Sequence, residues 1–386
     1  MLGLRKQDIA INKNGFLAVG IENPPASLPT YILALGSEKR VLGTEKVRGA
    51  NLAGFVLPLK TPYDIVAFAD RNGNGRLDAN ESAGVARDLT STPLADPAAA
   101  RQLYTIRLQK PAPADFVGLT VSTVSGDALP MAVGEVAKTS EARFAPKIGE
   151  DGLWKPETSL RAGNLGLYFT EPYDPSRIPV IFVHGIGGSP QDFAKLIPAL
   201  DRSRYQAWFF TYPSGFRLEK AASALAAMTK IAAKAHGVTR VHIVAHSMGG
   251  LVSRSAILKF QGGDVVVDRF ISISTPWNGH QAAAWGVRGL RYPVPSWIDM
   301  APGSDFLKRL WSQKLPSPTR HWLLFGYDTR RLPWLTLNND QVINVNSSLY
   351  VPAQDESVRV FGMERSHEGI LASPQTAVRM NQFLSE

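Results

Sequence analysis

The stretch "RVHIVAHSMGGLVSRSAILKF", residues 240–260, decides the fold of this chain. Its first seven residues are mostly apolar, as in a buried strand, and its last thirteen have the spacing of a helix. Only Ser247 stands in the turn between them. A strand that passes directly into a helix is typical of a parallel sheet covered by helices.

Predicted strands and helices alternate over residues 179–386. Apolar β-branched runs such as "VIFVHG" and "AWFFTY" alternate with helical patterns such as "LEKAASALAAMTKIAAKAHG". Ser189, Pro190 and Asp192 have the residue types of a helix start, and Gly237 stands where a helix should end. This part therefore predicts the α/β class, with a doubly wound, mostly parallel sheet and right-handed crossovers.

Residues 1–140 have a different pattern. Short alternating runs such as "FLAVGI", "TYILAL" and "DIVAFA" are separated by Pro, Gly and Asn turns. This pattern predicts a smaller all-β domain, a sandwich. Residues 141–178 are richer in Lys, Glu and Pro, and we expect them to form a linker or arm.

Composition excludes several kinds of protein. The 386 residues contain no cysteine, which excludes disulfides, thiolate metal sites and a cysteine nucleophile. No run of eighteen apolar residues predicts a transmembrane segment, and the first residues lack the apolar core of a signal peptide. A net charge of +9 is suited to an anionic surface as partner, but no Lys/Arg run is longer than a pair, so a dispersed, solvated surface charge is the preferred interpretation. No motif predicts nucleic-acid binding.

The turn at Ser247 has the form of a nucleophile elbow. Small residues two positions before and after the serine, here Ala245 and Gly249, let the backbone turn back without a clash. Alanine departs from the G-x-S-x-G pattern, but one methyl group leaves the turn feasible. The helix start also favours developing negative charge. For this motif alone, a serine that merely caps a helix is an equal alternative.

A second glycine-rich segment strengthens the interpretation. In "PVIFVHGIGGSPQDF", residues 179–193, a buried strand ends in glycines that let the backbone approach a ligand. The amides of Ile186 and Met248 would form an oxyanion hole. A dinucleotide or phosphate loop is the competing use, but "GIGG" lacks both the dinucleotide spacing and the Walker lysine.

With these motifs the chain resembles the serine hydrolases of the α/β-hydrolase fold, in particular bacterial lipases and esterases with "VHGIGG" and "AHSMGG". The resemblance covers Pro179 to the C-terminus. The runs "GNLGLYFTEPYDPSRIPV" and "YQAWFFTYPSG" also look like those of envelope hydrolases of the GPI-inositol-deacylase type. The resemblance implies cleavage of carboxylic esters through an acyl-enzyme, no cofactor for catalysis, and a location in the bacterial cell envelope or outside the cell.

In this fold the acid and the base follow the serine in chain order. Of the three later histidines, His280 comes too early and His321 begins an apolar strand, whereas His367 follows the strand "SVRVFGM". Asp340 in "NNDQVINVNSSLY" is the favoured acid. Asp328, at the end of "HWLLFGYD", is the alternative acid.

The segment 277–318 predicts a lid over the site. It contains Trp277, Trp285, Trp297 and Trp311, which would supply an apolar pocket for an acyl chain. The alternative is that these tryptophans are simply buried in helices.

Residues 70–81, "DRNGNGRLDANE", match the calcium loop of an EF-hand. Its ligand positions are occupied by Asp70, Asn72, Asn74, Arg76 (through its carbonyl), Asp78 and Glu81. The flanking residues predict strands instead of helices, so we expect a structural calcium ion in the β domain and not a calcium sensor.

The sequence thus predicts a carboxylic-ester hydrolase whose substrate is a small-molecule or lipid ester. An amidase, thioesterase or acyltransferase with the same triad is the rival among enzymes. A calcium-dependent surface-binding protein with a degenerate hydrolase domain is the rival of another class.

Overall fold

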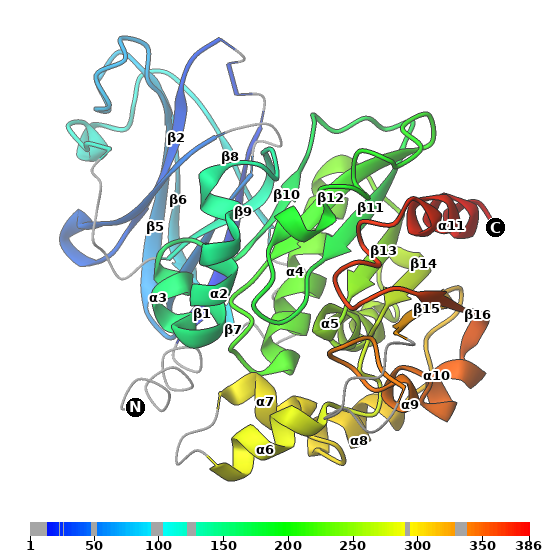
Figure 1. Cartoon of the computed structure of the whole chain (residues 1–386). Helices are drawn as coiled ribbons and strands as arrows, with labels where there is room; N and C mark the ends of the chain where they lie inside the picture. Colours follow the sequence, from blue (N-terminus) through cyan, green and yellow to red (C-terminus); the bar gives the residue numbers. More distant parts are fainter. Residues whose placement is uncertain are drawn as a thin grey trace.

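The structure is a computed structural model, and it describes residues 14–22, 24–25, 27–47, 52–93, 103–121, 129–289, 294–328 and 338–386. Within these residues the strands form a 12-stranded and a 4-stranded sheet. Figure 1 shows the strands of the N-terminal part on the left and the helix-covered part of the large sheet on the right.

The C-terminal part of the large sheet has the strand order β10-β12-β11-β13-β14-β15-β16. Neighbouring strands are parallel except β10 and β12, which are antiparallel. Its strands are β10 (Gly166–Phe169), β11 (Ile178–Val183), β12 (Tyr205–Thr211), β13 (Arg240–His246), β14 (Val266–Ile273), β15 (Arg320–Tyr327) and β16 (Ser357–Glu364). The predicted α/β class and the mostly parallel sheet are confirmed.

Helices cover both faces of this sheet. Apolar residues of α4 (Leu218–His236) and α5 (Met248–Ile257) belong to one core cluster, and those of α11 (Pro374–Ser385) belong to a second cluster formed with the other side of the strands. Helix α4 is rich in alanine, the best helix former, and ends at Gly237, whose φ of +67° suits glycine. Shorter helices complete this part: η5 (Pro190–Phe193), η6 (Leu258–Phe260), α9 (Val345–Ser348) and α10 (Val351–Asp355).

The helix start expected at Ser189 is present in a shorter form. Ser189 and Asp192 make a capping box, with Pro190 in the first turn, but they cap the four-residue 3₁₀ helix η5. Irregular turns with a second proline, Pro198, follow it.

The N-terminal part is a sandwich of two sheets. The 4-stranded sheet β3-β2-β5-β6 packs against β1, β4 and β8, and one apolar cluster contains residues from both layers. The elements are β1 (Asn14–Glu22), β2 (Thr30–Leu35), η1 (Ser37–Lys39), β3 (Val41–Lys46), β4 (Leu52–Pro58), β5 (Pro62–Ala69), β6 (Ser82–Thr90), β7 (Thr92–Pro93), β8 (Leu103–Arg107), η3 (Ala114–Phe116) and β9 (Leu129–Val136). The smaller all-β domain is therefore present.

One layer of this sandwich continues into the α/β part. Strand β9 pairs with β4 on one side and with β10 on the other, so backbone hydrogen bonds cross the boundary expected near residue 140. The expected linker, 141–178, contains η4 (Ala142–Phe144), α2 (Pro146–Trp154), α3 (Pro156–Arg161) and β10. Two of its prolines, Pro146 and Pro156, stand in the first turns of α2 and α3, so a composition typical of a linker belongs here to folded helices.

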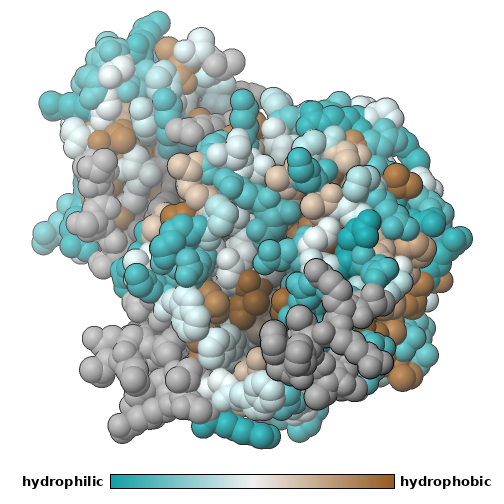
Figure 2. Space-filling model, in the orientation of Figure 1, coloured by the Kyte–Doolittle hydropathy of each residue, from teal (hydrophilic) through white to brown (hydrophobic). Residues whose placement is uncertain are grey.

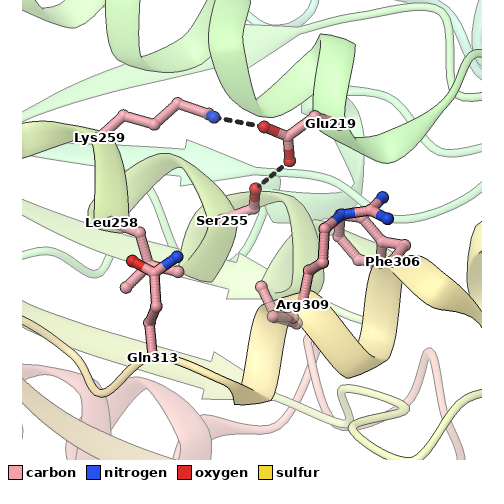
Figure 3. Close-up of a pocket in the computed structure, with 8 residues that line it drawn as sticks. Glu219, Ser255, Leu258, Lys259, Phe306, Arg309 and Gln313 are labelled. Carbon is pink, nitrogen blue, oxygen red and sulfur yellow. Dashed lines mark hydrogen bonds and ion pairs between the residues drawn. The ribbon is translucent and has the colours of Figure 1, made fainter.

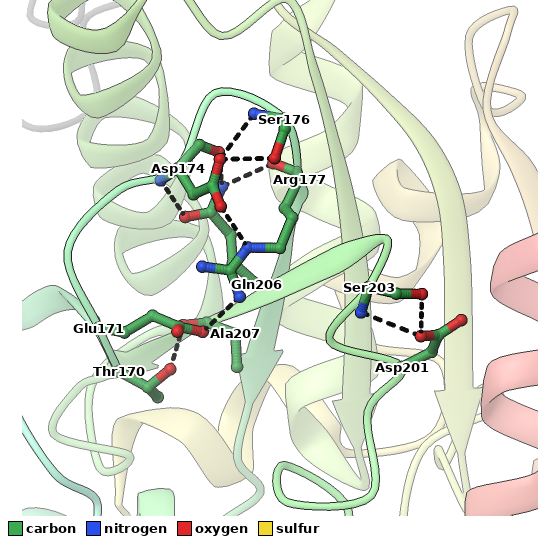
Figure 4. A network of polar contacts seen from close by, with 9 residues as sticks. All are labelled: Thr170, Glu171, Asp174, Ser176, Arg177, Asp201, Ser203, Gln206 and Ala207. Atoms are coloured by element: carbon green, nitrogen blue, oxygen red, sulfur yellow. Dashed lines mark hydrogen bonds and ion pairs between the residues drawn. The ribbon is translucent and has the colours of Figure 1, made fainter.

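The loop between β10 and β11 is held by a polar network (Figure 4). Arg177 bonds the carboxylates of Glu171 at 3.1 Å and Asp174 at 2.9 Å. The side-chain amide of Gln206 donates to the carbonyl groups of Asp174 and Arg177 at 2.7 and 2.6 Å. This network lies at the amino end of β11, whereas the glycine-rich segment follows its carboxyl end, so we assign it a structural role.

The expected lid contains three helices, which lie at the bottom of Figure 1: α6 (Gln281–Gly289), α7 (Pro295–Met300) and α8 (Asp305–Trp311). Residues 290–293 of this segment lie outside the described residues. Two partly buried ion pairs hold the described part of this segment in place. Asp299 of α7 bonds Arg217 at 2.7 Å, and Arg254 of α5 bonds Glu356 and the carbonyl groups of Leu310 and Gln313.

Among the described residues, no helix is both long and apolar enough to cross a bilayer. On the face drawn in Figure 2, hydrophilic side chains predominate over the described residues, and hydrophobic side chains gather in small patches.

Candidate active site

Ser247 stands alone in the turn between β13 and α5. Its backbone has φ +53° and ψ −130°, the mirror image of extended backbone, which is sterically costly for any residue but glycine. The turn is held by a hydrogen bond of 2.8 Å from the Ser247 amide to the Ile273 carbonyl. The serine is 4% exposed. The strained strand-to-helix turn expected at this serine is present.

Gly249 and Gly250, the glycines after Ser247, let the backbone of α5 lie close to the neighbouring residues. A Cβ on Gly249 would lie 3.0 Å from the carbonyl carbon of Val183 and still closer to the His184 oxygen, both at the end of β11. A Cβ on Gly250 would lie 2.7 Å from Cγ2 of Thr275. Only glycine lets α5 start this close to its neighbours.

The glycine loop, Gly185–Gly188, follows β11 and lies against Ser247. A Cβ on Gly185 would be 2.9 Å from the Ser247 Cβ and 3.4 Å from its Oγ. Among the described residues, no protein acceptor is bonded to the amide of Ile186 in this loop or to that of Met248 at the start of α5. Both predicted oxyanion donors therefore have N–H groups without a protein acceptor; Met248 follows Ser247 in the chain, and Ile186 follows Gly185.

His367 and Asp340 are brought together from two loops. Nδ1 of His367 lies 2.7 Å from Oδ2 of Asp340. Asp340 is fully buried, and its Oδ1 accepts the amides of Val342 and Ile343 at 3.1 and 2.6 Å. A backbone bond of 2.7 Å from the His367 amide to the Asp340 carbonyl joins the same two loops. Nδ1–H therefore donates to the carboxylate, which leaves Nε2 as the ring nitrogen with a free lone pair.

His246, the residue before Ser247, binds His367. Its Nε2–H donates to the His367 carbonyl at 2.9 Å, and the two ring centroids are 4.6 Å apart. Burial keeps the pKa of His246 well below its usual value, so the ring is neutral at ordinary pH. The serine, the histidine and the acid thus lie at the carboxyl edge of the sheet, after β13, β16 and β15.

The alternative acid Asp328 is placed elsewhere. It follows β15 directly, but its carboxylate accepts the side-chain amide of Gln341 at 2.5 Å and its backbone pairs with Asn339. Of the two candidate acids, the structure brings Asp340 to His367.

The two other histidines after Ser247 have other partners. His321 lies on β15 between the hydroxyl groups of Ser272 and Ser357, at 2.8 and 3.0 Å, and burial lowers its pKa to about 3. His280 bonds the Val342 carbonyl at 2.9 Å and so connects the base of the lid segment to the loop of Asp340.

The tryptophans of the lid segment divide into two pairs. Trp277 is fully buried against Phe270, and Trp311 packs edge-on against it at 5.6 Å and donates to its carbonyl. Trp285 is 64% exposed, and Trp297 meets Trp154 of α2 edge-on at 5.6 Å. Trp277 belongs to the core, Trp311 and Trp297 pack against that core, and only Trp285 of the four is exposed.

Asp192 is a half-buried carboxyl beside the glycine loop. Its Oδ2 accepts the Ser189 amide at 3.1 Å, and it would collide with a Cβ on Gly188. Burial raises its pKa to about 6, and the charge of Glu368, next to His367, adds to the rise.

This raised pKa predicts how stability depends on pH. Between the unfolded value of 3.8 and about 6 the folded protein keeps a proton that the unfolded chain loses, so stability falls as pH rises through this window. An asparagine at this position cannot ionise, so the variant Asp192→Asn does not lose stability in this window. We expect its free energy of unfolding to rise by up to about 3 kcal/mol relative to that of wild type between pH 4 and pH 7. Thermal unfolding of both proteins at several pH values measures the difference.

Asp201→Asn is the matched control. Hydrogen bonds from Ser203 lower the pKa of Asp201, so the stability that its carboxylate contributes is lost only on acidification. The difference in free energy of unfolding between Asp201→Asn and wild type should therefore stay nearly constant from pH 5 to pH 7 and shrink at low pH. A constant difference between Asp192→Asn and wild type across pH 4–7 would contradict the assignment.

The loop of Asp70 to Glu81 joins β5 to β6, so strands flank it as expected. Asp70 and Glu81 are 1% and 2% exposed, and both accept backbone amides: Asp70 from Gly73 and Gly75, Glu81 from Arg71 and Asp78. The side-chain amides of Asn72 and Asn74 donate to the Asp78 carboxylate at 2.9 Å each. Arg76 forms a β-bridge with Thr120.

Within the part of the chain that the structure describes, no three Asp, Glu, His or Cys side chains gather into a group able to hold a metal. Two of the loop's carboxylates are nevertheless buried with N–H donors as their hydrogen-bond partners. A cation would offset that burial.

A cavity of about 190 Å³ lies between α4, α5 and α8 (Figure 3). Three of its polar side chains bond one another: Glu219 pairs with Lys259 and accepts the Ser255 hydroxyl at 2.8 Å. None of its lining residues is Ser247, Asp340 or His367, so this cavity does not belong to the candidate active site.

Comparison with known families agrees with this geometry. A family model described as alpha/beta hydrolase fold matches residues 178–350, the part from β11 to the end of the Asp340 loop. These residues have the α/β-hydrolase fold. They contain Ser247 and Asp340, whereas β16 and His367 follow them in the chain. No curated protein matches the chain significantly.

Several solved structures are similar to it. Bacillus licheniformis lipase BlEst2 in mature form is 19% identical, with a TM-score of 0.43 over 57% of this chain and 96% of that chain. Aspergillus fumigatus lipase B is 19% identical, with a TM-score of 0.42 over 60% and 57%. Phospholipase PlaB from Legionella pneumophila is 17% identical, with a TM-score of 0.45 over 54% and 60%. Values this low transfer neither substrate nor mechanism.

Sequence reasoning missed three contacts of this site. His246 orients His367, Ser214 accepts the Gly187 amide at 2.8 Å, and Gly149 of α2 lies against the glycine loop. The two glycines at a spacing of three in "KIGEDGLW" were the available signal for the last contact.

Proposed function

We propose that this protein is a serine hydrolase that cleaves carboxylic esters through an acyl-enzyme on Ser247. The single observation that supports this most is the Asp340–His367 pair at 2.7 Å, held by His246 beside a serine in a strained turn. Strain of this kind persists where the surrounding structure maintains it, and it is characteristic of reactive sites. The match to the α/β-hydrolase family model supports hydrolysis as the reaction class.

Each residue has a defined role in the proposed reaction. Oγ of Ser247 attacks the ester carbonyl carbon while His367 Nε2 takes its proton, and the C–O bond to the alcohol breaks as the same nitrogen returns the proton to the leaving oxygen. A water molecule then repeats the cycle and releases the acid. Asp340 keeps Nδ1 protonated and stabilises the imidazolium, and the amides of Ile186 and Met248 bind the oxyanion.

An amidase, a thioesterase and an acyltransferase would use the same residues. They differ in the leaving group or in the acceptor of the acyl group, which the triad itself does not select. A calcium-dependent surface-binding protein with a degenerate hydrolase domain would not need the Asp340–His367 contact, and the intact set of residues favours an enzyme.

A panel of p-nitrophenyl esters of increasing acyl length tests the proposal. We expect turnover that a fluorophosphonate abolishes, with mass spectrometry locating one adduct on Ser247. Parallel amide and thioester substrates, and an added alcohol acceptor, distinguish the rival enzymes. Absence of both turnover and adduct would favour the surface-binding protein.

We also propose that the loop of residues 70–81 binds a structural calcium ion. The complete order of ligand types and the burial of Asp70 and Glu81 support this proposal. An ion that binds only the folded state stabilises it by mass action.

Millimolar Ca²⁺ should therefore raise the melting temperature, and the double variant Asp70→Ala, Glu81→Ala should lose the rise. Differential scanning calorimetry with Mg²⁺ in parallel measures the effect. Esterase activity should survive chelation, because the loop lies in the N-terminal sandwich. A melting curve unchanged by calcium would refute the metal site.

A further inference from the structure

Helix α2, which precedes the α/β-hydrolase part in the chain, packs directly on the glycine loop. The contact is made at Gly149: a Cβ there would lie 2.7 Å from the carbonyl carbon of Gly188 and 2.8 Å from the carbonyl oxygen of Gly187, and closest of all to the Gly188 oxygen. Real Cβ atoms do not approach backbone atoms this closely. Any side chain at Gly149 would therefore have to move either the loop or the helix.

The opposite side of the glycine loop lies against Ser247. Gly185 has room only for hydrogen there, since a Cβ would be 2.9 Å from the Ser247 Cβ. Ile186, the predicted oxyanion donor, follows Gly185, which contacts the serine, and precedes Gly187 and Gly188, which contact α2. The position of its amide is thus set from both sides.

Helix α2 is itself firmly placed. The Gly215 amide donates to the Gly152 carbonyl at 3.0 Å, and a Cβ on Gly215 would lie 3.1 Å from the Leu153 carbonyl carbon. The same turn supplies Ser214, whose hydroxyl accepts the Gly187 amide at 2.8 Å and is buried. The helix, the turn and the glycine loop form one packed unit.

We propose that α2 and Ser214 position the oxyanion donor of the active site, with Gly149 as the contact that lets the glycine loop reach its working place. This inference rests on the proposed hydrolase function and extends it to a segment outside the matched residues 178–350. The segment before the α/β-hydrolase part is then a component of the active site. Gly149 and Ser214 are positioning residues, because they act through the amide of Ile186.

The test compares two alanine variants of one helix. Gly149→Ala should lower kcat about 10² to 10³-fold, as loss or misplacement of an oxyanion donor does, with little change in KM. Glu150→Ala is the control on the same helix: Glu150 is exposed and pairs with Lys147 at 3.4 Å on the surface, so kcat should stay near wild type. Steady-state kinetics on an ester that wild type turns over measure both.

A boronic acid, whose tetrahedral adduct with Ser247 places an oxygen at the donors, supplies the second readout. Its affinity should fall with kcat in Gly149→Ala, whereas a general loss of folding would lower the active fraction and leave the affinity of the remaining enzyme unchanged. Circular dichroism and titration of active serines give that fraction.

Ser214→Ala keeps the test decisive if Gly149→Ala does not fold. It removes the acceptor of the Gly187 amide without adding an atom, and it should lower kcat and boronic-acid affinity together. If wild type hydrolyses esters while folded Gly149→Ala and Ser214→Ala match Glu150→Ala, the inference is wrong and the proposed function stands. If wild type has no Ser247-dependent activity, the proposed function itself fails.

Discussion

Ser247→Ala should lose about six orders of magnitude in kcat, as removal of the nucleophile does in other serine hydrolases. The alanine keeps the Cβ and removes only Oγ, so the loss reports the hydroxyl group. Steady-state kinetics with active-site titration measure it. Turnover within a few-fold of wild type in this variant would rule out an acyl-enzyme at this position.

Ser247→Gly separates chemistry from strain at the same residue. Backbone at φ +53° and ψ −130° costs a serine or alanine about 1 to 3 kcal/mol, whereas glycine reaches it freely and loses about 0.5 to 1 kcal/mol of chain entropy instead. We therefore expect Ser247→Gly to be as inactive as Ser247→Ala but more stable by about 1 kcal/mol in chemical denaturation. A glycine variant less stable than the alanine variant would show that this turn stores no strain.

Asp340→Asn should lower kcat by about four orders of magnitude while the protein stays folded. The carboxylate of Asp340 is fully buried and accepts His367 Nδ1–H, so it selects the tautomer whose Nε2 can take the serine proton. An asparagine could turn its NH₂ group to the ring, which favours the proton on Nε2 and blocks the base. Kinetics and circular dichroism on the purified variant give the rate and the folding.

Asp328→Asn is the matched control for this prediction. Asp328 also follows β15, but its carboxylate accepts Gln341 instead of a histidine, so the same exchange of oxygen for NH₂ should change kcat little. If Asp328→Asn lost the larger share of activity, the acid would have to be reassigned to Asp328.

The sequence was most informative where one short motif determines its own geometry. The run around Ser247 predicted strand, turn and helix because a serine without a loop on either side can only stand in a sharp turn. Likewise the glycines at 185–188 indicated close backbone approach, and Gly185 and Gly188 lie against Ser247 and Asp192.

The preference for Asp340 shows where sequence reasoning was limited. Asp340 and Asp328 both follow the same strand and precede the same histidine, so order along the chain fits either. The choice between them comes from Gly326 at the end of β15, where a Cβ would meet Asp340 Cβ at 3.2 Å, and from the two amides that orient its carboxylate.

The sequence by itself determined the local elements of this protein: the strands of both parts, the caps of α4 and η5, and the strained turn at Ser247. These depend on the residue types and spacing of neighbours in the chain, which a single sequence displays. Only the tertiary structure decided that β9 joins the sandwich to the α/β sheet, that 141–178 is folded, and that α2 touches the glycine loop. Such contacts join residues tens of positions apart, and they depend on which surfaces fit closely once the sheet has formed.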